Sequence, residues 1–327
     1  MTTKAAMLRR ISLALGAVFL ILGAHHGSFA KDQVRMGYLQ SDLHQLAAFV
    51  CLDRGFYRAE GVDVTVAGVF KAGPEEMSAF ASRDLDFGYV GEAPAAVAVA
   101  NKVADVKIIA QANLEGSAIV VRKDSGLTHL KDLVGKTVAV PGYATVQDFL
   151  FRRALSNSGI ELNSVNTIII KPPEMIPALT TKQIDAFVAW EPYPAKGVTS
   201  GAASVLAFSS DLWPKHPCCV LVVDARFLGK NPELVKGILR AHVKATRFIL
   251  ENPEEAVKAG VKFTGMDPET VKLAMKNIKY ECDPDVQGLL EYVTFLKERG
   301  HLKVNDPADF VRNVIDKKFF EEIMRSR

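Results

Sequence analysis

The chain has 327 residues, four cysteines and a formal net charge of +3. Its first 30 residues hold three basic residues and no acidic one, so the remainder carries 37 basic and 37 acidic residues. This balance gives no support to a nucleic-acid-binding function, which requires a basic surface. The length suits two lobes of ordinary domain size, and no apolar run after residue 30 is long enough to span a bilayer.

The N-terminus has the three parts of a secretory signal peptide. A basic start with Lys4 and two arginines precedes the apolar run ISLALGAVFLILGA, and the small residues of SFA follow at the spacing that signal peptidase recognises. We therefore predict a signal peptide over residues 1–30, with cleavage after Ala30 and export of the remainder.

The next segment alternates between strand and helix patterns. The sequence predicts, in order, a strand at 34–40, a helix at 43–61, a strand at 62–69, a helix at 73–85, a strand at 86–91, a helix with Pro94 in its first turn and a strand at 106–113. Such βαβ units build a parallel sheet, and ligands bind beyond the carboxyl ends of its strands.

The pattern then restarts. We predict a strand at 117–126 that crosses to a second lobe, a helix-strand-turn-helix segment at 130–159, a strand at 165–171, a short helix at 175–183 and a strand at 184–190 ending in a loop. The segments MSAFASRDLDFGYVGEAP and IPALTTKQIDAFVAWEPY match in order: short helix, acidic turn, apolar strand and a loop containing proline and an acid. We interpret this match as two similar lobes facing a cleft.

The remainder of the chain returns to the first lobe. CCVLVVDARFL predicts a strand that crosses back, and the tail is expected to be mostly helical. The tail helices are predicted at 232–252, 253–265, 268–278, 286–300 and 307–326, most of them with proline near the start.

At this point the order of motifs resembles a known family, the periplasmic substrate-binding proteins of ABC importers of the nitrate/sulfonate/taurine type. The resemblance rests on GYLQSDLHQLAAFVCLDRGFYRAEGVDV, SRDLDFGYVGEAPA, AIVVRKDSGLTHLKDLVGKTVAVPGYATVQDFL and QIDAFVAWEPY. It implies an α/β, two-lobed periplasmic-binding-protein fold (type II) with two crossover strands and hinge closure on a ligand. The expected parts are lobe 1 at 31–117, lobe 2 at 118–221 and the completion of lobe 1 at 222–327.

The resemblance also implies which loops hold the ligand. The corresponding positions are Ser41, Asp42, His44, Gly91, Glu92, Gly116, Ser117, Tyr143, Ala144, Thr145, Trp190 and Glu191. We add His216 because its loop, LWPKHPCC, is placed to reach the cleft.

For several of these residues, elementary chemistry also allows a purely structural role. Thr145 is at the start of a predicted helix, where its hydroxyl and the free N–H groups suit a sulfonate, carboxylate or nitrate oxygen. Alternatively, Thr145 only caps the helix. Trp190 either stacks on a ligand or packs under its loop. An ionised Glu92 would repel a bare anion, so it either meets a donor or cation on the ligand or only caps its helix.

Cysteines and histidines offer further alternatives. Cys218 and Cys219 are adjacent, and the geometry of a disulfide disfavours a bond between them. Either could form a disulfide with Cys282 in an exported protein, but we expect buried free thiols that behave as small apolar side chains. His44 and His216, with Cys218 or Glu92, invite a metal-site hypothesis, but no close spacing supports it. We expect neither a metal nor a cofactor.

We therefore expect a monomeric periplasmic binding protein, not an enzyme. It would capture a small polar organic solute, such as an alkylsulfonate, a taurine-like zwitterion or another donor-bearing anion, and deliver it to ABC permease and ATPase subunits. One alternative is a planar ligand resembling the thiamine pyrimidine. Another is an enzyme similar to the pyrimidine-precursor synthases of the same fold, whose longer cysteine run is absent here.

Overall fold

The computed structural model describes residues 33–326, which belong to one compact unit. The predicted signal peptide at 1–30 and its cleavage site lie outside the described residues. Within the described part, no helix is both long enough and apolar enough to cross a membrane.

The first sheet has the strand order β2-β1-β3-β11-β4. Its strands are β1 (Val34–Leu39), β2 (Val64–Phe70), β3 (Phe87–Gly91), β4 (Val106–Gln111) and β11 (Cys219–Asp224). β1 pairs in parallel with β2 and β3, as the alternating pattern predicts, but β11 runs antiparallel to both β3 and β4. The four strands of the predicted βαβ units therefore run parallel to one another. The returning strand β11 is inserted antiparallel between β3 and β4, which places Cys219 opposite Gly91.

The second sheet has the order β10-β6-β9-β7-β8. Its strands are β6 (Ser117–Arg122), β7 (Thr137–Val140), β8 (Asn166–Ile169), β9 (Ala186–Trp190) and β10 (Ala203–Phe208). Along β6, Ala118 and Val120 enter one apolar core while Ile119 and Val121 enter another. Side chains alternate between faces of a strand, so both faces of this sheet are buried, and each buried valine or isoleucine contributes about 1.5–3 kcal/mol.

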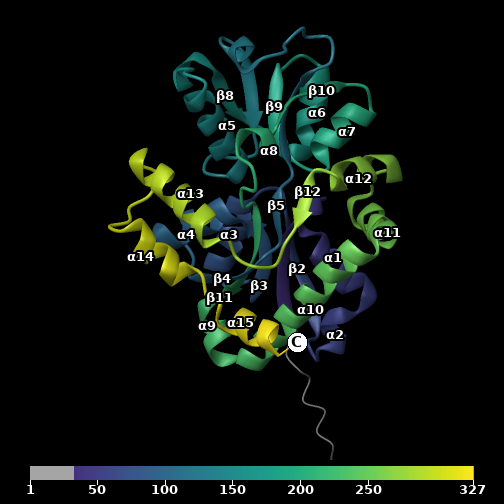
Figure 1. The fold of residues 1–327 in the computed structure, drawn as a ribbon, viewed down its shortest axis with the longest axis vertical. Coiled ribbons are helices and arrows are strands. Elements are labelled where there is room, and N and C mark those ends of the chain that lie inside the picture. The colour runs from purple at the N-terminus through teal and green to yellow at the C-terminus, as the bar shows by residue number, and fades with distance from the viewer. Residues whose placement is uncertain (1–32, 327) are drawn as a thin grey trace, which may run out of the picture. The chain divides into compact units, whose positions relative to one another are not determined.

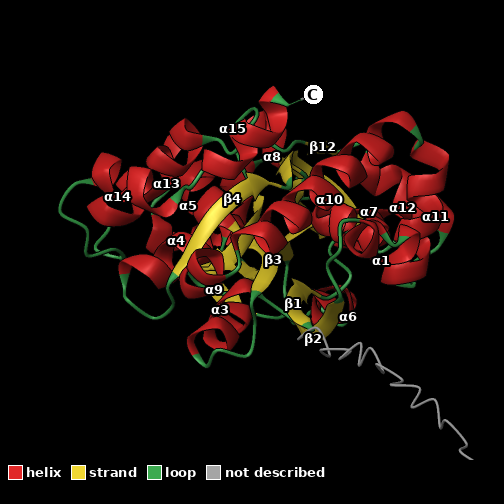
Figure 2. Cartoon of the chain, turned by 90° about the horizontal axis from the view of Figure 1, so that it is seen from below, coloured by secondary structure: helices red, strands yellow, loops and turns green. Residues whose placement is uncertain are grey.

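Helices between the strands cover the sheets. They are α1 (Leu46–Arg54), α2 (Phe56–Ala59), α3 (Gly73–Ala81), α4 (Glu92–Ala100), α5 (Val146–Asn157), α6 (Pro172–Thr180), α7 (Tyr193–Thr199) and α8 (Ser209–Leu212). Figure 2 shows α3 and α4 on one side of the first sheet, and α1 and the C-terminal helix α10 (Pro232–Glu251) on the other.

The C-terminal part is mostly helical, as predicted, and Figure 1 shows its helices beside the first sheet. It comprises α9 (Ala225–Lys230), α10 (Pro232–Glu251), α11 (Pro253–Thr264), α12 (Pro268–Met275), α13 (Val286–Glu298), α14 (Pro307–Val314) and α15 (Lys318–Arg325). A short strand in this part, β12 (Ile278–Tyr280), pairs with β5 (Asn113–Glu115). The chain thus leaves the first sheet after β4 and returns at β11, while the exact lobe boundaries stay a prediction.

Two predicted helices are each divided in the structure. The helix predicted at 43–61 breaks at Gly55, whose φ of +67° ends α1 in the left-handed conformation that glycine adopts without strain. The helix predicted at 307–326 breaks at Ile315, which forms a bridge with Ile108 at the edge of β4. Sequence patterns did not predict β10, β12, α7 or α8, all of which are short elements.

Candidate functional site

The two sheets present matching loops. β3 ends at Gly91 and is followed by Glu92, and β9 ends at Trp190 and is followed by Glu191. The backbone N–H of Glu92 donates to the carbonyl of Cys218 at 2.7 Å, and that of Glu191 donates to the carbonyl of Gly116 at 2.8 Å. Each loop is therefore attached to the antiparallel strand beside it, β11 in one sheet and β6 in the other.

A small cavity of about 10 Å³ lies where these strand ends meet. It is lined by Leu39, Asp42, His44, Gly73, Gly91, Pro94, Thr145, Val146, Gln147, Trp190, Cys218 and Cys219. The volume is close to the minimum that holds one water molecule, so no organic solute fits in this conformation. Five predicted residues line the cavity: Asp42, His44, Gly91, Thr145 and Trp190.

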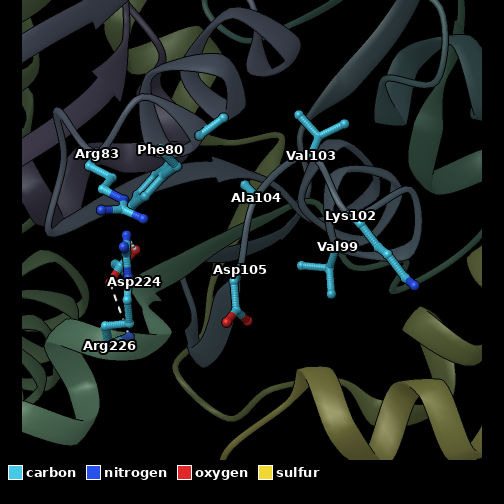
Figure 3. Close-up of a pocket in the computed structure, with 10 residues that line it drawn as sticks. Phe80, Arg83, Val99, Lys102, Val103, Ala104, Asp105, Asp224 and Arg226 are labelled. Atoms are coloured by element: carbon cyan, nitrogen blue, oxygen red, sulfur yellow. Dashed lines mark hydrogen bonds and ion pairs between the residues drawn. The ribbon is translucent and has the colours of Figure 1, made fainter.

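A larger pocket of about 470 Å³ lies at the opposite edge of the first sheet (Figure 3). Arg83 and Asp105 precede β3 and β4, and Asp224 ends β11, so this pocket lies where the parallel strands begin. The guanidinium of Arg226 in this pocket already pairs with Asp224 at 3.0 Å. Parallel sheets bind ligands at the other edge, and we therefore take the smaller cavity as the candidate site.

Four cavity-lining side chains form one polar cluster. The Nδ1 atom of His44 lies 3.2 Å from Sγ of Cys218 and 3.9 Å from Sγ of Cys219. Asp42 stands beside them, with its Oδ2 3.7 Å from Sγ of Cys219 and its Oδ1 3.8 Å from Nδ1 of His44. On the far side of the imidazole, Nε2 lies 2.7 Å from the carbonyl oxygen of Gly116, which can only accept, so this nitrogen donates.

Burial and mutual contact shift the pKa of each group in this cluster. Burial raises the pKa of Asp42 to about 7. Burial opposes charge on His44, but the nearby Cys218 and Asp42 outweigh it and raise the His44 pKa to about 9. Burial likewise opposes a Cys218 thiolate, yet hydrogen bonding by Cys219 and the charge of His44 hold the Cys218 pKa well below its usual range. The cluster therefore favours a thiolate–imidazolium pair.

The start of α5 is capped by the protein itself. The Thr145 hydroxyl accepts from the N–H of Asp148 at 3.3 Å and donates to the carbonyl of Gly142 at 2.8 Å. The carboxylate of Asp148 accepts the N–H of Ala144 at 2.9 Å. The capping interpretation of Thr145 is thus confirmed, and an anion at this helix start would meet the Asp148 carboxylate.

The two loop glutamates are both buried but differ in their partners. Glu191 accepts from the amide of Asn277 at 2.7 Å and from the N–H of Ala195 at 3.0 Å, and burial raises its pKa to about 7. Neither carboxyl oxygen of Glu92 has a hydrogen-bond partner among the described residues, and Glu92 is not among the cavity-lining residues. Burial, with Asp285 nearby, raises the Glu92 pKa well above its usual range.

The other predicted residues lie around the cavity or outside it. Gly116 and Ser117 stand behind it, where the Ser117 hydroxyl accepts from the amide of Gln147 at 2.9 Å. Ser41 donates to the carbonyl of Thr264 at 3.2 Å, and His216 is buried with its Nδ1 3.0 Å from its neighbour's carbonyl. Tyr143 is 53% exposed, so it does not reach the cavity in this conformation.

Four residues that line the cavity were not among the predicted site residues: Gly73, Gln147, Cys218 and Cys219. Gln147 lies in the first turn of α5, and its amide points toward both Ser117 and Cys218. Cys218 and Cys219 are buried and form no disulfide, as expected, but they contact His44 and do not behave as apolar side chains. The available signal was the CC pair where β11 begins. Gly73 gave no signal.

Similar proteins were found by sequence and by structure. A putative binding protein of Brucella abortus is 30% identical over 85% of this chain and 89% of its own. The taurine-binding periplasmic protein of Escherichia coli is 30% identical over 74% of this chain and 80% of its own. The structure of the periplasmic nitrate-binding protein of Synechocystis superposes with a TM-score of 0.81 at 18% identity, covering 90% of this chain and 88% of its own.

These findings confirm the predicted fold and the resemblance to binding proteins of the nitrate, sulfonate and taurine group. The nitrate-binding structure is informative for the fold alone, since its sequence identity is low. Residues 28–261 match the NMT1-like family over more than half of the chain. The chain belongs to the NMT1-like family.

Proposed function

We propose that this protein is an exported solute-binding component of an ABC importer, which binds a small polar organic solute between the carboxyl edges of its two sheets. Trp190 carries the proposal. Its side chain lines the cavity and is only 3% exposed, and its indole N–H has no hydrogen-bond partner among the described residues. A buried donor without a partner is unfavourable, so Trp190 is suited to a solute that brings an acceptor oxygen.

The cavity also indicates what else the solute carries. Among the described residues, no lysine or arginine lines it, whereas the carboxyl group of Asp42 does. The positive charge of His44 is already matched by Cys218, 3.2 Å away. A bare anion such as nitrate finds little charge compensation here, whereas a zwitterion can give an acceptor oxygen to Trp190 and a donor to Asp42. We therefore favour a taurine-like or other donor-bearing anion over nitrate.

Solute entry requires the two sheets to separate. In the closed arrangement the N–H of Leu43 donates to the carbonyl of Glu191 at 3.1 Å. Helices α3 and α6 are also joined by reciprocal ion pairs, of Lys171 with Glu75 at 2.8 Å and of Lys71 with Glu174 at 3.1 Å. Opening at this seam admits solute, and closure excludes water and completes its hydrogen bonds. Permease and ATPase subunits would then receive the solute from the periplasm.

A thermal-shift panel followed by calorimetry tests this proposal. It compares taurine-like zwitterions with alkylsulfonates that lack a donor, nitrate, aromatic carboxylates and aminopyrimidines. A bound solute raises the melting temperature in proportion to the logarithm of its concentration above Kd. We expect the zwitterions to give the largest shift. A larger shift with aminopyrimidines would replace the proposed solute class, and turnover of any panel member would contradict a pure binding role.

A further inference from the structure

Within the polar cluster, His44, Cys218 and Cys219 have the geometry of a metal site, and Asp42 lies beside them. We propose that these three residues bind one thiophilic divalent cation of the zinc class. The two sulfurs and the imidazole Nδ1 all lie within 4.8 Å of one another. Metal binding at this site is distinct from the proposed solute binding, because metal uptake can be measured with no solute present.

The distances fit a tetrahedral ion. Zinc bonds of about 2.0–2.3 Å in tetrahedral geometry place ligand atoms roughly 3.3–3.8 Å apart. Here His44 Nδ1 lies 3.2 and 3.9 Å from the two sulfurs. Asp42 lies next to this set, with Oδ1 3.8 Å from His44 Nδ1 and Oδ2 3.7 Å from Cys219 Sγ, so its carboxyl group would have to turn to supply a fourth ligand. Two thiolates and one imidazole are donors typical of zinc, not of magnesium or calcium.

The groups behind the ligands are those that a metal site needs. His44 Nε2 donates to the carbonyl of Gly116 at 2.7 Å, so Nδ1 is the ring nitrogen that faces the sulfurs, and it would release its proton when it binds a metal ion. The close approach depends on glycine, because a Cβ on Gly116 would lie 2.3 Å from His44 Nε2. The amides of Gln45 and Gln147 each donate to a cysteine sulfur at 3.9 Å, which stabilises thiolates.

The fold brings together ligands that are far apart in sequence. Asp42 and His44 belong to the turn after β1, and the cysteines lie about 174 residues later at the start of β11. Consecutive strand residues point to opposite faces, but Cys218 precedes the first residue of β11, so both sulfurs reach the same imidazole. These side chains line the cavity, so a bound ion would stand at its wall. The two thiolates would compensate the charge of a divalent ion, so the metal site would not by itself attract a bare anion.

Metal titration of the purified, reduced protein tests the proposal directly. The protein is stripped with a chelator and titrated with Zn²⁺ against a chromophoric chelator. We expect uptake of one equivalent, and we expect the Cys218→Ser/Cys219→Ser and His44→Gln variants to bind at least about 100-fold more weakly, since even outer-shell changes cost about 10–100-fold. Cys282→Ser and His129→Gln, which change the same residue types outside the cluster, should keep the wild-type affinity.

Cobalt substitution keeps the test independent of how the variants fold. Co²⁺ bound by thiolates in the wild-type protein gives sulfur-to-metal charge-transfer absorption in the near ultraviolet and the intense visible bands of tetrahedral cobalt. These bands are expected at one equivalent. Absence of stoichiometric zinc uptake, cobalt bands without a thiolate signature, or equal zinc affinity in the double cysteine variant would each overturn the proposal.

Discussion

Glu92 and Glu191 occupy equivalent places in the two sheets but have different surroundings. Each follows a fully buried strand, and each donates its backbone N–H to an adjacent antiparallel strand. Among the described residues, the Glu191 carboxyl group accepts hydrogen bonds from Asn277 and Ala195, whereas the Glu92 carboxyl group has no hydrogen-bond partner. The same local sequence pattern therefore positions a backbone reliably, whereas the role of the side chain depends on what the C-terminal helices place beside it.

The largest expected effect comes from Gly116, whose carbonyl accepts from both Glu191 and His44. Gly116→Ala adds a Cβ 2.3 Å from His44 Nε2 at a φ of +87°, so we expect a loss of about 3 kcal/mol in the free energy of unfolding. Urea denaturation measures it. Gly126→Ala is the control, because Gly126 has a φ of +71° but a Cβ added there would meet no described atom within 4 Å beyond its chain neighbours, and it should cost only about 1 kcal/mol. Equal losses would contradict the role assigned to this contact.

Charge-neutral substitution should separate the two glutamates. Glu191→Gln replaces an acceptor oxygen by a donor facing Asn277 or the N–H of Ala195. We expect a loss of about 1–3 kcal/mol at about pH 4, where ionisation of this carboxyl in the unfolded state contributes little. Glu92→Gln exchanges one buried group without a hydrogen-bond partner among the described residues for another, and at the same pH we expect a change within about 1 kcal/mol. Chemical denaturation measures the free energy of unfolding of both variants. A larger loss for Glu92→Gln than for Glu191→Gln would contradict the difference that we describe between the two carboxyl groups.

The two glutamates should also differ in pH dependence. A carboxyl whose folded pKa is raised binds its proton more tightly in the folded state, so stability falls as pH rises from the unfolded pKa to the folded one. For Glu191 that window runs from the usual 4.5 to about 7. For Glu92 it extends further, since its pKa is raised well above the usual range.

Free energies of unfolding measured across this pH range test the difference. Each raised carboxyl contributes a slope of at most about 1.4 kcal/mol per pH unit. Glu191→Gln should flatten the profile between pH 4.5 and about 7. Glu92→Gln should flatten it over a range that begins at the same lower pH and extends well above it. Indistinguishable profiles for the two variants would show that the two carboxyl groups have similar environments.

The smallest effect is expected from the exposed ion pairs between α3 and α6. Glu75→Gln and Glu174→Gln each remove one pair with lysine, and exposed pairs contribute about 0–1 kcal/mol. We expect solute affinity to change less than about fivefold for each variant, and added salt to reduce the difference further. A tenfold or larger loss measured by calorimetry would mean that these pairs, not the cavity, dominate closure.

Much of the fold followed from the sequence because its signals are local. Alternating strand and helix patterns, Pro94 in the first turn of α4 and Thr145 as a helix cap all depend on residues a few positions apart. The antiparallel insertion of β11 could not be predicted in the same way, because it pairs residue 219 with residue 91. The position of Cys218 beside His44 depends on that pairing, which is why the cysteines were expected to be simple buried thiols.

The sequence indicated which residues line the cavity where a place at a strand end decides the position of the side chain. Asp42, Gly91 and Trp190 line the cavity as their positions after β1, at the end of β3 and at the end of β9 indicate. It was less informative for Glu92 and Tyr143, because the direction of a side chain depends on packing against distant helices. The carboxyl group of Glu92 lies near Asp285 and Tyr292, which follow it by almost 200 residues.

The two tryptophans of this chain allow the most direct test of solute binding in the cavity. Trp190 lines the cavity, whereas Trp213 packs under the guanidinium of Arg153, 4.3 Å above its ring, and is not among the lining residues. The best solute of the panel is titrated into Trp213→Phe and into Trp190→Phe while tryptophan fluorescence is recorded. We predict a saturable change in Trp213→Phe, where only Trp190 emits, and little change in Trp190→Phe. A signal confined to Trp190→Phe, with calorimetric binding intact in both variants, would place the solute elsewhere and contradict the proposed site.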